Sequence, residues 1–109
     1  MKIAIVGSRK LTIKLEDYIR VEVKEIVSGG ARGVDLCAAE YARKNGIKLT
    51  EFLPQYERYG RRAPIVRNKE IVDYADEVIA FWDGRSRGTL SVINYAKKVG
   101  KPIRIVLCG

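Results

Sequence analysis

The chain has 109 residues, of which 47% are hydrophobic and 31% charged, and its 21 Lys and Arg outnumber 13 Asp and Glu to give a net charge of +8. This length and composition predict one globular domain spanning residues 1–109. The chain contains no histidine, which excludes a His-based general base, a Ser-His-Asp triad and a His-ligated metal. The excess of positive charge favours an anionic partner such as a nucleotide or a nucleic acid.

The apolar runs are short and the two cysteines are isolated. Met1 and Lys2 lead directly into a predicted strand, so we expect neither a membrane span nor a signal peptide. Cys37 and Cys108 lack the spacing of a zinc site and are interpreted as small apolar residues in a reducing compartment. These features predict a cytoplasmic protein that does not contact membranes and has no metal site.

The first half of the chain alternates apolar runs with glycine-containing turns. Residues 3–6 form an uninterrupted apolar run that predicts a strand buried on both faces at the centre of a parallel sheet. After Gly7, Ser8 and Arg9, apolar residues at positions 15, 18, 19 and 23 have the spacing of a helix. We then predict a second strand at about residues 23–27, a helix at about residues 33–45 that ends at Gly46, and a third strand at residues 47–53.

The second half continues this alternation after one longer connection. Residues 54–64 are predicted to be irregular, and their interleaved tyrosines and arginines indicate either a flap over a ligand or a solvated connection. A helix over residues 65–75, a strand over 78–82, a helix that stops at Gly100 and a strand over 103–107 follow. The order predicts an α/β fold, a three-layer, Rossmann-like, doubly wound parallel sheet of about five strands.

The loop at residues 28–35, Ser-Gly-Gly-Ala-Arg-Gly-Val-Asp, carries the main functional pattern. Its glycines let backbone N–H groups face an anion, and the following helix adds its positive end. Two similar loops follow the first and fourth predicted strands, at residues 7–9 and 83–89. We call the loops at residues 7–9, 28–35 and 83–89 the first, second and third loops. Ligands of such sheets bind beyond the C-terminal ends of the strands. The three loops predict a phosphate site, although any one of them alone is equally typical of a tight strand-to-helix connection.

Arginines gather in the loops that leave the C-terminal ends of strands, whereas lysines fall where strands begin. The loop arginines are Arg9, Arg32, Arg58, Arg61, Arg62, Arg85 and Arg87, and the lysines are Lys24, Lys48 and Lys101. Because arginine recognises phosphate through two parallel hydrogen bonds, this asymmetry favours a phosphate-bearing ligand at one rim of the sheet.

These loops, together with Arg67-Asn68 and Gly88-Thr89, resemble the Rossmann-like superfamily that joins DprA/Smf proteins with the LOG phosphoribohydrolases (SLOG). The chain is most similar to its small stand-alone DprA-like or YAcAr-like members. The resemblance implies that the glycine loops hold phosphate. In LOG enzymes a glutamate in a Gly-Gly-x-Gly-Thr-x-x-Glu loop takes part in cleaving the N-glycosidic bond; here its place is taken by Val92, so we expect no appreciable release of base.

The favoured hypothesis is a domain that binds a nucleotide or nucleotide-derived phosphate ligand, as a sensor or processing domain. The expected binding residues are Gly7, Ser8, Arg9, Ser28, Gly29, Gly30, Arg32, Gly33, Asp35, Arg67, Asn68, Asp83, Gly84, Gly88 and Thr89. One alternative is a DprA-like single-stranded nucleic-acid-binding protein that stacks bases on Tyr56, Tyr59 and Trp82. Another is a nucleotide hydrolase in which Asp35, Asp83 or Glu57 acts as acid or base.

Two roles remain open for several of these residues. Ser8 and Thr89 are equally typical of helix caps, and Asp35 of a residue that complements a helix dipole. The predicted helices also offer more apolar residues than one small sheet face needs, which predicts a homodimer or higher oligomer. These residues are Ile65, Val66, Ile71, Val72, Leu90, Val92, Ile93 and Ala96.

Overall fold

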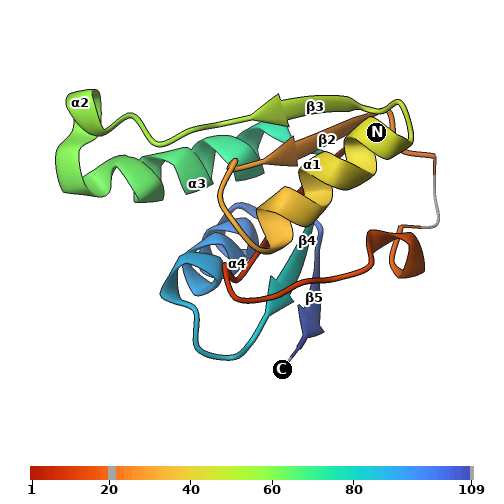
Figure 1. Cartoon of the computed structure of the whole chain (residues 1–109). Helices are drawn as coiled ribbons and strands as arrows, with labels where there is room; N and C mark the ends of the chain where they lie inside the picture. The colour runs from red at the N-terminus through yellow and green to blue at the C-terminus, as the bar shows by residue number, and fades with distance from the viewer. Residues whose placement is uncertain (20–21, 109) are drawn as a thin grey trace.

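The computed structural model describes residues 1–19 and 22–108. Five strands alternate with helices along the chain (Figure 1). The strands are β1 (Lys2–Gly7), β2 (Glu25–Ser28), β3 (Lys48–Glu51), β4 (Glu77–Trp82) and β5 (Ile103–Leu107). The helices are η1 (Leu15–Asp17), α1 (Val34–Lys44), α2 (Tyr56–Tyr59), η2 (Gly60–Arg62), α3 (Ala63–Tyr74) and α4 (Arg87–Val99), where η denotes a 3-10 helix.

All strand pairs in the sheet are parallel, and the strand order is β3-β2-β1-β4-β5. The predicted central strand is confirmed, because β1 lies between β2 and β4 and its residues Ile3, Ala4, Ile5 and Val6 are all buried. The chain starts in the middle, adds two strands on one side, and then crosses to the other side. The Rossmann-like doubly wound fold expected from the sequence is therefore confirmed.

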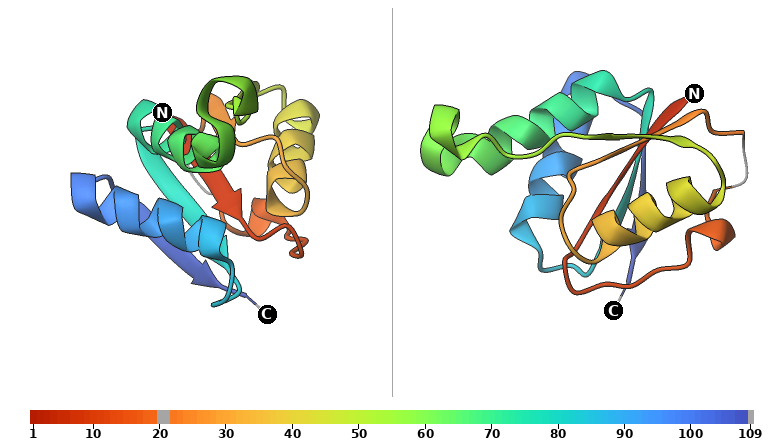
Figure 2. Two further views of the ribbon diagram at one scale, coloured as in Figure 1. Left: turned by 90° about the vertical axis from the view of Figure 1, so that its left-hand side faces the viewer. Right: turned by 45° about the horizontal axis from the view of Figure 1, so that its top comes forward.

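Each face of the sheet has its own core. Helices α3 and α4 cover one face, where Ile71, Val92 and Ile93 pack against Ala4 and Val6 of β1. Helix α1 and the segment around η1 cover the other face, where buried residues of both segments pack against Ile3, Ile5 and Phe81. Figure 2 shows α1 and α4 on opposite sides of the strands. Helical side chains at i, i+3 and i+4 provide the apolar stripe on each covering helix.

The helix predicted from the apolar residues at positions 15–23 is wrong: this segment contains only the single turn η1, and its positions 20 and 21 lie outside the described residues. The cause is a competing alternation, because Leu11, Ile13 and Leu15 face the core while Thr12 and Lys14 are exposed. An extended chain with this pattern covers the sheet without a helix. Tyr18 completes the cover, with its ring edge-on to Phe81 at 4.9 Å between centroids.

The irregular segment predicted at residues 54–64 is also partly wrong, since α2 and η2 occupy most of it and run directly into α3. Pro64 lies in the first turn of α3, a position where the missing N–H and fixed φ of proline suit a helix start. Figure 1 shows α2 and the start of α3 projecting beyond the end of β3, well clear of the sheet. The β3 strand is also shorter than the predicted 47–53.

Most of the apolar helical residues that prompted the oligomer prediction lie in the core of this domain. Ile71, Val72, Val92, Ile93 and Ala96 are each at most 2% exposed, whereas Ile65 is 47% and Leu90 37% exposed. The homo-oligomer stays a prediction, now carried by fewer residues than the sequence suggested.

Candidate functional site

The three glycine loops predicted to form a site line one cavity of about 520 Å³ at the C-terminal ends of the strands. Parallel strands end at the same edge of a sheet, so the loops after β1, β2 and β4 meet there. Of the residues expected from the sequence, those lining this cavity are Gly7, Ser8, Arg9, Gly29, Asp35, Arg67, Asn68, Asp83, Gly88 and Thr89. We call it the main cavity.

Two glycines allow the first loop to lie directly against the start of α1. A Cβ atom on Gly7 would lie 2.5 Å from Cγ2 of Val34 and 2.7 Å from the carbonyl oxygen of Phe81. A Cβ atom on Gly33 would overlap the carbonyl oxygen of Ser8 and lie 2.6 Å from that of Arg9. Gly33 also has φ of 69°, where side chains are strained. These close approaches bring the Ser8–Arg9 backbone to the N-terminus of α1.

Helices α1 and α4 both begin at the main cavity. The N–H of Val34 donates to the Ser8 carbonyl oxygen at 3.3 Å, and Asp35 in the same turn lines the cavity. At α4, the Ser86 side chain accepts a hydrogen bond from the N–H of Thr89 at 3.4 Å. Gly88 and Thr89 of that turn also line the cavity. Two helix N-termini therefore contribute partial positive charge to one space.

The backbone N–H groups of the second loop are already engaged by side chains of this chain. Ser28 Oγ accepts a hydrogen bond from the Gly30 N–H at 3.3 Å, and Asp35 Oδ2 accepts one from the Ala31 N–H at 3.1 Å. The sequence predicted that these groups would face a phosphate, so the structure gives them a different partner. Asp35 is 8% exposed, and this burial raises the pKa of its carboxyl group above the usual value, while the Ala31 N–H and the charge of Arg67 oppose the rise.

A second carboxylate, that of Asp83, organises the third loop in the same way. Its Oδ1 accepts hydrogen bonds from the N–H groups of Arg85 and Ser86, both at 2.8 Å, and its Oδ2 accepts one from the Ser8 hydroxyl at 3.3 Å. The two N–H donors are the main reason that the pKa of Asp83 lies below its usual value. Asp83 thus ties the first and third loops together, and Gly84, with φ of 81°, makes the turn within the third loop.

Arg67 holds the second loop and the end of β3 in place. It is 9% exposed, and its Nη1 donates to the carbonyl oxygens of Gly29 at 2.8 Å and Phe52 at 3.4 Å. Its Nε donates to Oδ1 of Asn68 at 3.0 Å. A Cβ atom on Gly29 would lie 2.7 Å from Nη1 of Arg67, so a larger residue there would displace this guanidinium from its present position. These bonds position the cavity wall, a structural role that the sequence did not reveal.

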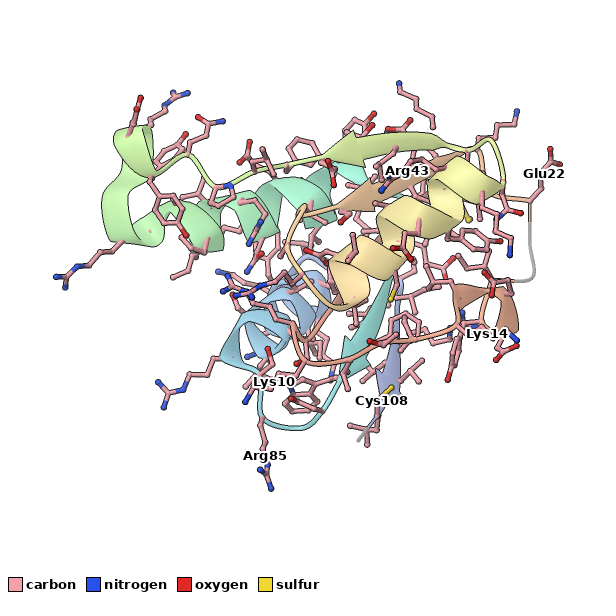
Figure 3. The ribbon with its side chains drawn as sticks, in the orientation of Figure 1. Lys10, Lys14, Glu22, Arg43, Arg85 and Cys108 are labelled. Carbon is pink, nitrogen blue, oxygen red and sulfur yellow. The ribbon has the colours of Figure 1, made fainter. Side chains whose placement is uncertain are left out.

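The remaining cationic side chains at the main cavity are Arg9, Lys10 and Arg85. Arg9 and Lys10 are exposed and lie just after β1, where the chain passes the start of α1. Figure 3 shows the Arg85 side chain pointing away from the body of the domain. Among the loop arginines of the sequence, Arg58, Arg61 and Arg62 lie instead on the projecting α2 and η2 segment. Lys48 and Lys101 lie at or just before the start of a strand, at the opposite edge, as expected.

Five expected residues do not line the main cavity. Gly30 and Arg32 line a smaller adjacent cavity of about 290 Å³. Ser28 is fully buried, and its Oγ accepts a hydrogen bond from the Gly30 N–H. Gly33 allows the backbone of Ser8 to approach α1, and Gly84 makes the turn of the third loop. Conversely, the sequence missed the lining residues Val6, Lys10, Ala31, Pro64, Ile71, Ser86 and Val92. Pro64 and Ile71 come from α3, and only the tertiary arrangement brings that helix to the loops.

The aromatic residues considered for base stacking do not line the main cavity. Tyr56 is 56% exposed on α2, and Tyr59 lies beside Arg58 with 5.2 Å between the guanidinium carbon and the ring centroid. Trp82 is the last residue of β4, and its Nε1 donates to the carbonyl oxygen of Ser86 in the third loop at 3.0 Å. Glu57, considered as an acid or base, lies on α2.

Residues 1–19 and 22–108 contain no group of three or more His, Cys, Asp or Glu side chains placed to hold a metal ion. None of the helices in this part of the chain is long and apolar enough to cross a membrane.

Comparison with known proteins identifies the family. A family model described as YAcAr, the YspA, cpYpsA-related SLOG family, matches residues 1–59, which contain the first and second glycine loops. The chain is 39% identical over 84 residues to the gene 61 protein of Mycobacterium phage D29, an alignment covering 72% of this chain and 67% of the phage protein. No solved structure matches significantly. The resemblance seen in the sequence is confirmed, and the chain belongs to the YspA, cpYpsA-related SLOG family.

Proposed function

We propose that the chain binds a nucleotide or nucleotide-derived phosphate ligand in the main cavity. The observation that carries this proposal is the meeting of two helix N-termini with Arg9 and Lys10 around a single space of about 520 Å³. Helix N-termini and cationic side chains stabilise an anionic group. The volume falls within the range of small-molecule sites.

The two carboxylates at the main cavity favour a nucleotide over inorganic phosphate. Asp35 and Asp83 both line it, and each uses an oxygen to accept hydrogen bonds from loop N–H groups. Carboxylate oxygens have further lone pairs that accept hydrogen bonds from hydroxyl groups. In a ligand that combines a phosphate with sugar hydroxyls, the phosphate can face the cationic groups while the hydroxyls donate to the carboxylates. A bare phosphate has no such hydroxyl donors and is repelled by the two carboxylate charges.

The test replaces one cationic side chain and measures nucleotide affinity by isothermal titration calorimetry. Because a charge-assisted hydrogen bond contributes about 1.5 to 3 kcal/mol, Arg9→Ala should weaken the preferred nucleotide by roughly ten- to a hundredfold. Arg43→Ala is the control, since Arg43 lies exposed on α1 and makes the same change in net charge. Equal losses in the two variants would mean that the ligand responds to net charge, and the cavity proposal would be wrong.

One observation favours a second candidate, a protein that binds single-stranded nucleic acid. Arg58, Arg61 and Arg62 lie together with exposed Tyr56 on the segment that projects beyond the sheet. Arginines that track phosphates and an exposed ring that stacks on bases are typical of such proteins. Salt discriminates the two functions, because the logarithm of affinity for a single strand falls with log salt by about 0.7 for each phosphate contacted. A mononucleotide in the main cavity has only one phosphate group to contact, so its affinity should depend much less on salt.

A further inference from the structure

A second cavity of about 290 Å³ lies directly beside the main cavity. The two share Arg9, Gly29, Ala31 and Arg67 as lining residues, so the second glycine loop forms a wall of both. A ligand bound in one can therefore extend over this loop into the other. We call the smaller one the side cavity.

The walls of the side cavity differ in chemistry from those of the main cavity. Leu53 and Pro54 provide an apolar surface, and Arg32 provides a guanidinium. Leu53 is 58% exposed and lies over Gly30, where an added Cβ atom would be 2.6 Å from its Cδ2. A carboxylate oxygen of Glu51 lies 3.4 Å from the same position. This is an open apolar platform with charged groups beside it.

We infer that the side cavity holds the nucleobase of the ligand while the main cavity holds its sugar and phosphate, an inference that rests on the proposed function. A base is flat and has two weakly polar faces, which suit an apolar platform such as Leu53 and Pro54. The planar guanidinium of Arg32 suits stacking on the same ring. Binding would cover the exposed leucine, whose burial is favourable.

The opposite orientation, with phosphate in the side cavity, fits the contacts less well. Gly30 and Ala31 line the side cavity, but their N–H groups are already bonded to Ser28 Oγ and Asp35 Oδ2. The start of α4 lines the main cavity through Gly88 and Thr89 and does not line the side cavity. The Thr89 N–H is itself bonded to Ser86 Oγ, so α4 contributes mainly the positive end of its dipole. A phosphate is therefore better stabilised in the main cavity, where that helix begins.

The experiment compares ligands with and without a base. Titration calorimetry measures the affinity of ribose 5-phosphate and of the four common ribonucleoside 5′-monophosphates for the parent chain and for Leu53→Ser. In the parent, at least one mononucleotide should bind about tenfold more tightly than ribose 5-phosphate. Leu53→Ser should remove that difference and leave the affinity for ribose 5-phosphate unchanged.

Leu107→Ser is the matched control, because Leu107 is 72% exposed on β5 and lines neither cavity. It should preserve the difference between the ligands. Arg32→Ala provides a second variant from the same cavity and should also weaken the mononucleotide without affecting ribose 5-phosphate.

The outcomes separate the two proposals. If no mononucleotide binds more tightly than ribose 5-phosphate, or if the difference persists in both Leu53→Ser and Arg32→Ala, the base lies elsewhere and the inference is overturned while the proposed function stands. If the parent binds neither ribose 5-phosphate nor any mononucleotide at millimolar concentration, the proposed function itself is wrong.

Discussion

Replacement of Gly33 by alanine tests how the first loop is held against α1. Gly33 has φ of 69° and ψ of −124°, and Gly60 has nearly the same conformation, φ of 57° and ψ of −131°. A Cβ atom would overlap the backbone of Ser8 and Arg9 at Gly33, whereas at Gly60 it would find no atom within 4 Å. The two substitutions therefore share one backbone cost and differ only in the steric contact.

The magnitudes follow from these two terms. A side chain in such a conformation costs about 1 to 3 kcal/mol, and the change in unfolded-chain entropy from Gly to Ala is common to both variants. Forcing an extra methyl group against a packed backbone costs about 1 to 3 kcal/mol more. The free energy of unfolding should thus fall by about 2 to 6 kcal/mol in Gly33→Ala and by about 1 to 3 kcal/mol in Gly60→Ala.

Urea unfolding followed by far-ultraviolet circular dichroism measures both values. The free energy of unfolding of a small domain is about 5 to 15 kcal/mol. A Gly33→Ala variant that does not fold therefore agrees with this expectation, provided that Gly60→Ala folds. Equal stabilities of the two variants would show that Gly33 does not hold the first loop against α1, and the account of the cavity wall would be wrong.

Two further substitutions test the buried charges of the site. Arg67→Ala removes the donor to the buried Gly29 carbonyl oxygen and should lower the free energy of unfolding by roughly 3 kcal/mol. Arg62→Ala is the control, because Arg62 is exposed and its loss should leave urea unfolding nearly unchanged. Similar urea midpoints for the two variants would contradict the role of Arg67 in positioning the second loop. Burial raises the pKa of Asp35 above 3.8, so the stability that it contributes is complete below that pH and declines as pH rises through the folded-state pKa. Asp35→Asn, which keeps an acceptor for the Ala31 N–H, should therefore melt above the parent at pH 7 and equal to it near pH 3; a lower melting temperature at pH 7 would refute this sign.

The layout of the sheet could be read from the sequence because its strands have distinctive patterns. Residues 3–6 and 78–82 are continuous apolar runs, and residues 3–6 and 78–81 are buried on two faces as a central parallel strand requires, while Trp82 at the end of β4 is half-buried. The segment between β1 and β2 was predicted wrongly because its apolar residues fit both a helical and an alternating period. The alternation of Leu11, Ile13 and Leu15 was the correct one. The burial of one sheet face by an extended segment is a tertiary choice that helical spacing cannot reveal.

The sequence predicted where the site lies but not the hydrogen bonds that its residues make with one another. Strand topology alone brings the three loops together, so the residues at strand ends were found. The Asp83–Gly84–Arg85 sequence is typical of a turn in which the aspartate accepts the N–H two residues ahead, and this signal was available. The partners of Arg67, in contrast, come from β2 and the end of β3, distant in the chain, and no local pattern indicates them.

The most direct test of nucleotide binding in the main cavity is a titration of the isotope-labelled chain with the best-binding mononucleotide, followed by amide chemical shifts in NMR. The account predicts that the largest changes fall in the three loops, at residues 7–10, 29–35 and 83–89, which line or border the two cavities. Changes concentrated at the opposite edge of the sheet, around Lys24 and Lys48, or no changes at millimolar nucleotide, would contradict it.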